Sequence, residues 1–482
     1  MAVGFASPRD GRLAEQSLNR TPLLLAAGLG ALIAVAVVLA PPLQVGLAFL
    51  STGVAILAFF NRRIALYLII PALTLSPDIS AFGVPARLED FLMVPLTIGW
   101  LAKLCVFRER ERTPLDRLLL AYLLVGVAAT LWGGYLGTAH LFTADKYVSS
   151  SFHLFKRVEF VLLFFIMADT LRTPAEVQRC TYILMASMVG LSAFGLSQFL
   201  SNGYIAQGPQ GSPGHEPGLA SMLNVVLALA LLPSARSSAR LLLSAVILFS
   251  IAVLPLSLGR NFLVATMLVS LYVGLFQQRW VLAFLTAPWV IGLALYPGHV
   301  IQRLGTLAHL SSFTHEYGTQ AVQGASVFYR LQAPETFSLL ALGRSPVLGF
   351  GPGSVPLGFI DSEYVIQIFY TGLVGLAIFL LLTTRLFGLT RRTLEVARDP
   401  VHVGLVRGFQ LALASYMISS IFNASLSATR TGGPFFVIAG LIAVLYRSLT
   451  QSTREASSGA PLSTQKLFPP PPRRLSLRWA LR

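Results

Sequence analysis

The sequence predicts an all-α, polytopic transmembrane helix bundle, and its composition gives two reasons. Of the 482 residues, 55% are hydrophobic and only 12% are charged, whereas an average soluble domain carries about 25% charged residues. Lys and Arg outnumber Asp and Glu by 36 to 20, and in so apolar a chain we expect this excess to orient the protein in a lipid bilayer rather than to bind nucleic acid. The two cysteines are too few for a disulfide framework.

Fourteen apolar runs are candidate membrane spans, because a span needs about 20 mainly apolar residues, or fewer where neighbouring helices cover its ends. The runs cover residues 22–40, 45–60, 64–75, 91–106, 118–136, 158–167, 182–200, 219–232, 241–256, 262–276, 281–296, 364–386, 405–422 and 435–446. The third and sixth runs are short, so counts of twelve or thirteen stay open. The first run reads as an uncleaved signal anchor.

Basic residues predict the orientation, because cytoplasmic loops carry most of the Lys and Arg. With both termini in the cytoplasm, the outer side receives only Arg87, Lys146, Lys156, Arg157, Arg260, Arg303, Arg330, Arg344 and Arg430. The resulting layout is a cytoplasmic N-terminus (1–21), spans 1 to 11 (22–296), a periplasmic loop (297–360), spans 12 to 14 (361–447) and a disordered cytoplasmic tail (448–482).

The predicted loop 297–360 is the longest outward connection, and a loop of this length is usually functional. Apolar residues at helical spacing over 300–313 and 327–340 predict short amphipathic helices on the outer leaflet. A turn rich in Gly and Pro follows over 343–353. Its glycines Gly349, Gly351 and Gly353 would let backbone N–H groups approach a ligand, although the turn could equally be a plain connector.

Arginines at the outer boundary predict an anion site. Arg260 lies in the short turn Ser257–Asn261, where the next helix begins and its first N–H groups are free. Arg330 and Arg344 lie on the long loop. A guanidinium offers a rigid donor fork that matches phosphate oxygens. The alternatives are that Arg260 only sets the depth of a helix and that Arg330 and Arg344 are solvated charges.

Two acids precede the twelfth predicted span and are candidate general bases. Asp361 and Glu363 lie beside Tyr364 at the point where the chain enters the membrane. Asp361 could instead cap the helix, and Glu363 could simply favour the helix dipole. Rival bases on the long loop, each more typical of surface residues, are His299, His309, His315 and Glu316.

These residues together resemble the O-antigen ligase and polymerase superfamily. The resemblance covers roughly residues 208–386 and rests on several short elements. They are Ser-Leu-Gly-Arg-Asn at 257–261, Arg330, Ser-Pro-Val-Leu-Gly-Phe-Gly-Pro-Gly at 345–353, Asp-Ser-Glu-Tyr at 361–364 and Tyr-Thr-Gly-Leu-Val-Gly-Leu at 370–376. Pro-Gly-Leu-Ala at 217–220 also resembles a family element, with Gly218 in place of an Asn.

The resemblance implies a multi-pass enzyme of the bacterial inner membrane that uses an undecaprenyl-diphosphate-linked glycan as donor and a second glycan as acceptor, without a metal ion or other cofactor. Arg260 and Arg330, assisted by Arg344, would hold the diphosphate, and Asn261 and Tyr364 would position substrate. Ligases of the family place a His before the twelfth-type helix, where this chain has Asp361-Ser362. This difference favours a polymerase of O-antigen or exopolysaccharide repeats, with a chain-length regulator or flippase as partner.

Three other functions stay open. A ligase would transfer the finished glycan to lipid A core. A lipid-linked sugar flippase or secondary transporter would bury polar sites near the membrane midplane, and Lys156, Arg157 and Glu159 are the residues that fit this reading, since they could pair or line a cavity. A structural assembly factor would not need Arg at the membrane boundary.

Overall fold

A computed structural model describes residues 60–76, 79–81, 84–107, 112–136, 146–202, 215–257, 259–276, 338–354, 362–427 and 429–457, together with Gly53 and Val281. Helices dominate these ranges. Their strands form one antiparallel hairpin, in which β1 (Ile79–Ala81) pairs with β2 (Val84–Ala86). The predicted helical fold class is therefore confirmed at this level.

The helices follow the apolar runs of the sequence. They are α4 (Arg62–Leu75), α5 (Leu88–Phe107), α6 (Asp116–Tyr135), α7 (Lys146–Thr170), α8 (Pro174–Asn202), α9 (His215–Leu231), the 3-10 turn η2 (Leu232–Ser234), α10 (Ser237–Leu256), α11 (Arg260–Phe276), α15 (Glu363–Val396), α16 (Pro400–Ser419) and α17 (Thr429–Ser457). The candidate spans 22–40 and 45–60, and 281–296 beyond Val281, lie outside the described residues.

Seven of the described helices are long and apolar enough to span a membrane, namely α6, α8, α9, α10, α15, α16 and α17. Helix α11 is apolar but shorter. These helices support a membrane protein, whereas the predicted total of fourteen spans is not confirmed. Within the predicted loop 297–360, the structure describes only 338–354. Residues 338–344 are helical, so the helix includes Gly343 and Arg344, which were predicted to start the turn, and the glycine turn follows.

Helix α7 extends well beyond its prediction. The apolar run 158–167 predicts a short span, but α7 is 25 residues long and continues through Lys156 and Arg157. The side chains of Lys156, Arg157 and Glu159 are buried. The predicted run was too short because it began only after Lys156 and Arg157, whereas at least Lys156 finds carboxylate partners inside the bundle, which lowers the cost of burying it.

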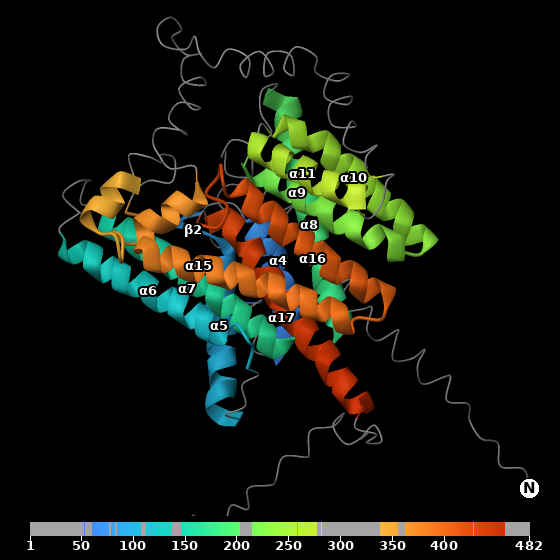
Figure 1. The fold of residues 1–482 in the computed structure, drawn as a ribbon, viewed down its shortest axis with the longest axis horizontal. Coiled ribbons are helices and arrows are strands. Elements are labelled where there is room, and N and C mark those ends of the chain that lie inside the picture. Colours follow the sequence, from blue (N-terminus) through green and yellow to red (C-terminus); the bar gives the residue numbers. More distant parts are fainter. Residues whose placement is uncertain are drawn as a thin grey trace, which may run out of the picture.

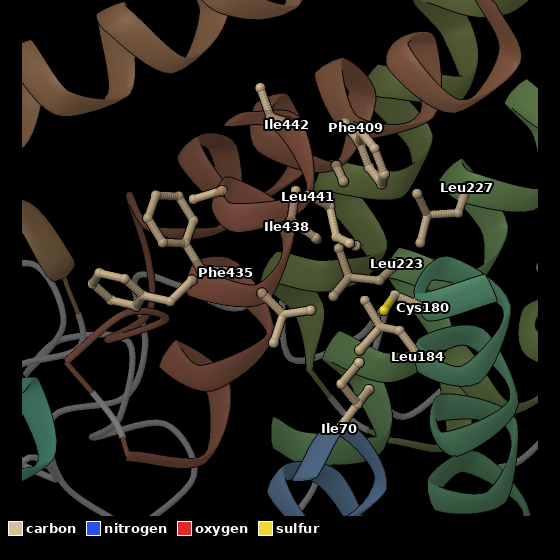
Figure 2. Close-up of a cluster of buried hydrophobic side chains, with 14 of the residues drawn as sticks. Ile70, Cys180, Leu184, Leu223, Leu227, Phe409, Phe435, Ile438, Leu441 and Ile442 are labelled. Atoms are coloured by element: carbon tan, nitrogen blue, oxygen red, sulfur yellow. The ribbon is translucent and has the colours of Figure 1, made fainter. Parts of the chain in front are cut away.

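The apolar core lies where α4, α8, α9, α16 and α17 meet. Figure 2 shows Cys180, Leu223, Phe409 and Ile438 from four of these helices converging on one another. Helices α6, α7 and α15 lie on one side of this core, and α10 and α11 lie on the other, as Figure 1 shows. The outer faces of α6 and α10 expose large apolar side chains such as Leu124 and Leu241, as expected for surfaces in contact with lipid.

Contacts between helices define two ends of the bundle. At one end, where α15 begins and α16 stops, the amide of Glu363 donates to the carbonyl of Ser420 at 2.9 Å. At the other end, Arg447 of α17 donates through Nη2 to the carbonyl of Leu171, just after α7, at 2.7 Å. We call these the Glu363 end and the Arg447 end.

Candidate functional site

The glycine turn, residues 345–354, lies against a break in α15. Gly372 has φ 67° and ψ −168° and interrupts the helix, so backbone groups beside it lose their helical partners. The turn supplies four replacement hydrogen bonds: Leu373 N to Pro346 O at 2.8 Å, Val374 N to Val347 O at 3.3 Å, Phe350 N to Phe369 O at 2.8 Å and Gly351 N to Tyr370 O at 2.9 Å. Non-helical backbone inside a membrane protein requires such partners.

The glycines of the turn are needed for its shape. Gly349, Gly351 and Gly353 have φ values of 67°, 92° and 71°, a region that side-chain-bearing residues rarely adopt. A Cβ atom on Gly349 would also lie 2.6 Å from the carbonyl oxygen of Phe369. The amide of Gly349 donates to Ser345 O at 3.0 Å, and that of Gly351 is used as above. These two amides therefore point into the protein rather than toward a ligand, which corrects the expected role of the turn.

Glu363 is fully buried and accepts four hydrogen bonds. Its Oε1 accepts from Gln367 Nε2 and Ser427 Oγ, both at 2.7 Å, and its Oε2 accepts from the amides of Leu426 at 3.0 Å and Ser427 at 2.9 Å. The carboxylate thereby ties the start of α15 to the segment between α16 and α17. Such saturation suits a positioning role better than proton transfer, because taking up a proton would displace a donor.

Tyr364 has a related task, since its hydroxyl donates to the carbonyl of Met417 at 3.1 Å and so holds α15 against α16. The other predicted base, Asp361, lies outside the described residues, as does the diphosphate ligand Arg330. Arg344 is described, and it is exposed at the end of the short helix that leads into the glycine turn. Its neighbour Ser345 accepts a hydrogen bond from Trp132 Nε1 of α6 at 3.0 Å.

The arginine turn at 257–261 packs on the start of α9. A Cβ atom on Gly218 would lie 2.6 Å from Cδ2 of Phe262 and 2.8 Å from Oγ of Ser257, so two elements of the resemblance are in direct contact. Arg260 is the first residue of α11, and its side chain is outside the description. The Nδ2 atom of Asn261 is buried without a hydrogen-bond partner among the described residues.

Helix α7 brings a buried charge cluster that sequence reasoning only partly anticipated. We call Arg87, Glu89, Asp90, Lys156 and Glu159 the Lys156 network. Lys156 Nζ contacts Asp90 directly and lies 3.0 Å from Glu159 Oε2 and 3.8 Å from Glu89 Oε1, while Arg87 pairs with Glu89 at 3.1 Å. The Lys156–Glu159 pair was visible as i,i+3 spacing on a helix. Nothing in the sequence showed that the first turn of α5 would face Lys156.

Arg157 lies beside this network but outside it. Its guanidinium carbon is 5.1 Å from the ring centroid of Tyr122 on α6 and 5.9 Å from that of Tyr370 on α15. The side chain is 7% exposed, and its Nη1 and Nη2 atoms have no hydrogen-bond partner within the described part of the chain. Tyr370 also contacts the glycine turn, through its carbonyl to Gly351 and its side chain to the Gly353 backbone.

A small polar cavity lies at the Glu363 end. Its polar lining comes from Thr74, Ser76, Arg87, Glu216 and Thr431, on the ends of α4, α5, α9 and α17 that meet there. The opposite wall is apolar, with residues of α8 and α9. At this end of the bundle, the start of α9 contacts the turn at 257–261, and the glycine turn separately contacts the first half of α15.

Comparison with known proteins adds no family assignment. No protein-family model matches the chain, and no curated protein matches it either. The assignment of a function therefore depends on the residues and their geometry.

Proposed function

We propose that this protein is a membrane glycosyltransferase that polymerises undecaprenyl-diphosphate-linked oligosaccharide repeats at the periplasmic face of a bacterial inner membrane. The observation that carries the proposal is that sequence elements far apart in the chain meet in two pairs toward the Glu363 end. The 345–353 turn meets the break in α15 after Tyr370, and Gly218 meets the arginine turn. These are the elements through which the sequence resembles O-antigen polymerases and ligases.

The distribution of charge supports the orientation. Arg63, Arg172, Arg240, Arg398 and Arg447 lie on or beside helix ends that belong to the Arg447 end. Since basic residues favour the cytoplasmic side, this end would face the cytoplasm and the Glu363 end the periplasm. A lipid-linked repeat with its diphosphate at the outer boundary would then reach the turns with its isoprenoid tail still in the bilayer.

The reaction requires few catalytic groups from the protein, because the donor carries its own leaving group. The acceptor hydroxyl oxygen attacks C1 of the donor sugar, the C1–O bond to the diphosphate breaks with inversion, and undecaprenyl diphosphate leaves with the bonding electrons. Arg260, Arg330 and Arg344 would stabilise the charge that develops on the diphosphate. Asp361 would accept the proton of the hydroxyl, since the carboxylate of Glu363 is already saturated with donors.

Two alternatives have distinct support. A ligase would use the same donor and transfer the glycan to lipid A core. A flippase or secondary transporter is favoured by the Lys156 network, because ionisable groups buried within membrane helices often mark ion or substrate pathways.

Deletion of the chromosomal gene, followed by gel analysis of the cell's glycans, tests the proposal. Loss of polymerisation leaves products of a single repeat, whereas loss of ligation leaves long glycans on the carrier lipid, and loss of a flippase leaves repeats on the cytoplasmic side. Complementation with the intact gene and with Arg407→Gln, an exposed residue of α16, should restore long chains. Complementation with Asp361→Asn should not.

A further inference from the structure

Arg157 is a buried cation whose charge the described residues leave unpaired. Their ion pairs occupy Lys156, Arg87 and Arg63, and none includes Arg157. Burying an ion strongly destabilises a protein unless the ion gains a counter-charge and hydrogen bonds. A guanidinium cannot escape this cost by losing its proton, so the arrangement favours a bound anion.

The aromatic neighbours surround the guanidinium with π-electron density. Its Cζ atom lies over the rings of Tyr122 and Tyr370, 5.1 Å and 5.9 Å from their centroids. Nη1 and Nη2 are buried and have no hydrogen-bond acceptor among the described residues, so they are the donors that two oxygens of a phosphate would engage. Glu363 is linked to Tyr122 through Gln367 Nε2, which lies 2.7 Å from Glu363 Oε1 and 3.4 Å from the Tyr122 hydroxyl, and its carboxylate is saturated by four donors.

The surroundings indicate a ligand that comes from the lipid. Helix α6, which carries Tyr122, exposes Leu120, Leu124 and Leu131 on its outer face, so an isoprenoid tail would find an apolar surface next to the site. Tyr370 lies seven residues after Glu363 in α15, a rise of about 10 Å from the helix start. In the proposed orientation, Tyr370 therefore lies about 10 Å from the outer end of α15.

We propose that Arg157 binds the diphosphate group of a polyprenyl-linked substrate, with Tyr122 and Tyr370 as positioning residues for the guanidinium. The choice of a lipid diphosphate rests on the proposed function. The site adds a diphosphate-binding residue that the sequence linked only to the transporter alternative. Through Tyr370 it adjoins the glycine turn, which explains why the turn is fixed so firmly to that residue by Gly351 and Gly353.

Binding of undecaprenyl diphosphate to the purified full-length protein in detergent tests this site, with the shift in unfolding temperature as readout and undecaprenol as the uncharged control lipid. The wild type should bind the diphosphate and not undecaprenol. Arg157→Gln should bind about tenfold more weakly or worse, as expected for loss of a charge-assisted pair. Arg157→Lys should fall between the two, because it keeps the charge and loses the fork. Arg407→Gln should bind within about twofold of the wild type.

Unchanged binding in Arg157→Gln, or a wild type that does not distinguish undecaprenyl diphosphate from undecaprenol, overturns the proposal. If Arg157→Gln weakens binding only of lipids that bear acidic sugars, Arg157 binds a sugar carboxylate instead of the diphosphate, and this result also overturns the proposal. Without ligand, the variants should unfold at or above the wild-type temperature, whereas a marked loss of stability in Gln, Met and Lys variants alike would reveal a purely structural residue. A protein that binds through Arg157 but makes no polymer removes the proposed function and leaves this site standing.

Discussion

Two neighbouring buried cations on helix α7 have different kinds of partners. Toward α5, Lys156 is surrounded by the carboxylates of Asp90, Glu159 and Glu89. Toward α6 and α15, the next residue, Arg157, contacts two tyrosine rings and has no ion pair among the described residues. Both side chains are buried to more than nine-tenths. The comparison teaches that burial alone does not identify a functional charge, and that the unpaired member of such a pair is the stronger candidate for a ligand.

Lys156→Met should break the paired side and have the largest effect on stability. It leaves Glu89, Asp90 and Glu159 facing one another without their shared cation, and loss of one partner from a buried pair costs about 3–5 kcal/mol. Thermal unfolding of the purified protein in detergent measures the change. The double variant Lys156→Met/Glu159→Gln should recover part of the loss, and equal stability of Lys156→Met and the wild type would contradict the network.

Glu363→Ala tests a second fully paired charge. It removes the acceptor for the amides of Leu426 and Ser427 and for two side-chain donors, and we expect a loss of about 3 kcal/mol, since hydrogen bonds to charged groups are worth about 1.5–3 kcal/mol each. Chemical denaturation measures it. Glu395→Gln is the matched control, because Glu395 is exposed on the same helix and should change stability by less than about 0.5 kcal/mol. Similar results for the two variants would argue against the clamp.

Gly349→Ala sharpens the comparison by disturbing the turn that supports Tyr370. The new Cβ would lie 2.6 Å from Phe369 O at a φ of 67°, and strain with overpacking should cost about 1–3 kcal/mol. Gly343→Ala is its control, because a Cβ there meets nothing within 4 Å. The measurement is the unfolding temperature of each alanine variant, compared with that of the wild type. If Gly343→Ala is the more damaging of the two, the packing of the turn is misassigned.

Arg157→Met should have the smallest effect on stability in the absence of ligand. Replacing an unpaired buried charge by an apolar side chain of similar length removes a desolvation penalty, so the unfolding temperature should hold or rise. The unfolding temperature of Lys156→Met, measured in the same way, provides the comparison. A loss as large as that of Lys156→Met would mean that the two sides of α7 do not differ as described.

The sequence predicted the helices better than their contacts. Apolar runs located α6, α8 and α10 to within a few residues at most ends, because lipid-facing and core-facing positions are both apolar and leave a continuous signal. Helix α7 was underestimated because Lys156 is stabilised by Asp90, 66 positions earlier, and a run of apolar residues carries no record of such a partner.

The candidate site was predictable in its residue types and not in their roles. The glycines at 349, 351 and 353 correctly indicated a tight turn, since three positive φ values require them. Their amides, however, serve the break at Gly372, which sequence inspection could not place beside the turn. Glu363 was rightly singled out as unusual, but its donors at 426–427 come from a segment 63 positions away. Arg157 was noted as a charge beside the sixth predicted span, and the packing of Tyr122 and Tyr370 around it became visible only in the structure.

Reconstitution into liposomes tests the central claim most directly. The purified protein, supplied with lipid-linked repeat units and no ion gradient, should convert them to longer chains and release undecaprenyl diphosphate, and Arg157→Gln should slow this conversion by about tenfold or more, while Arg407→Gln leaves it unchanged. Lipid-linked repeats that stay single, or that only cross the bilayer without elongation, would contradict the account.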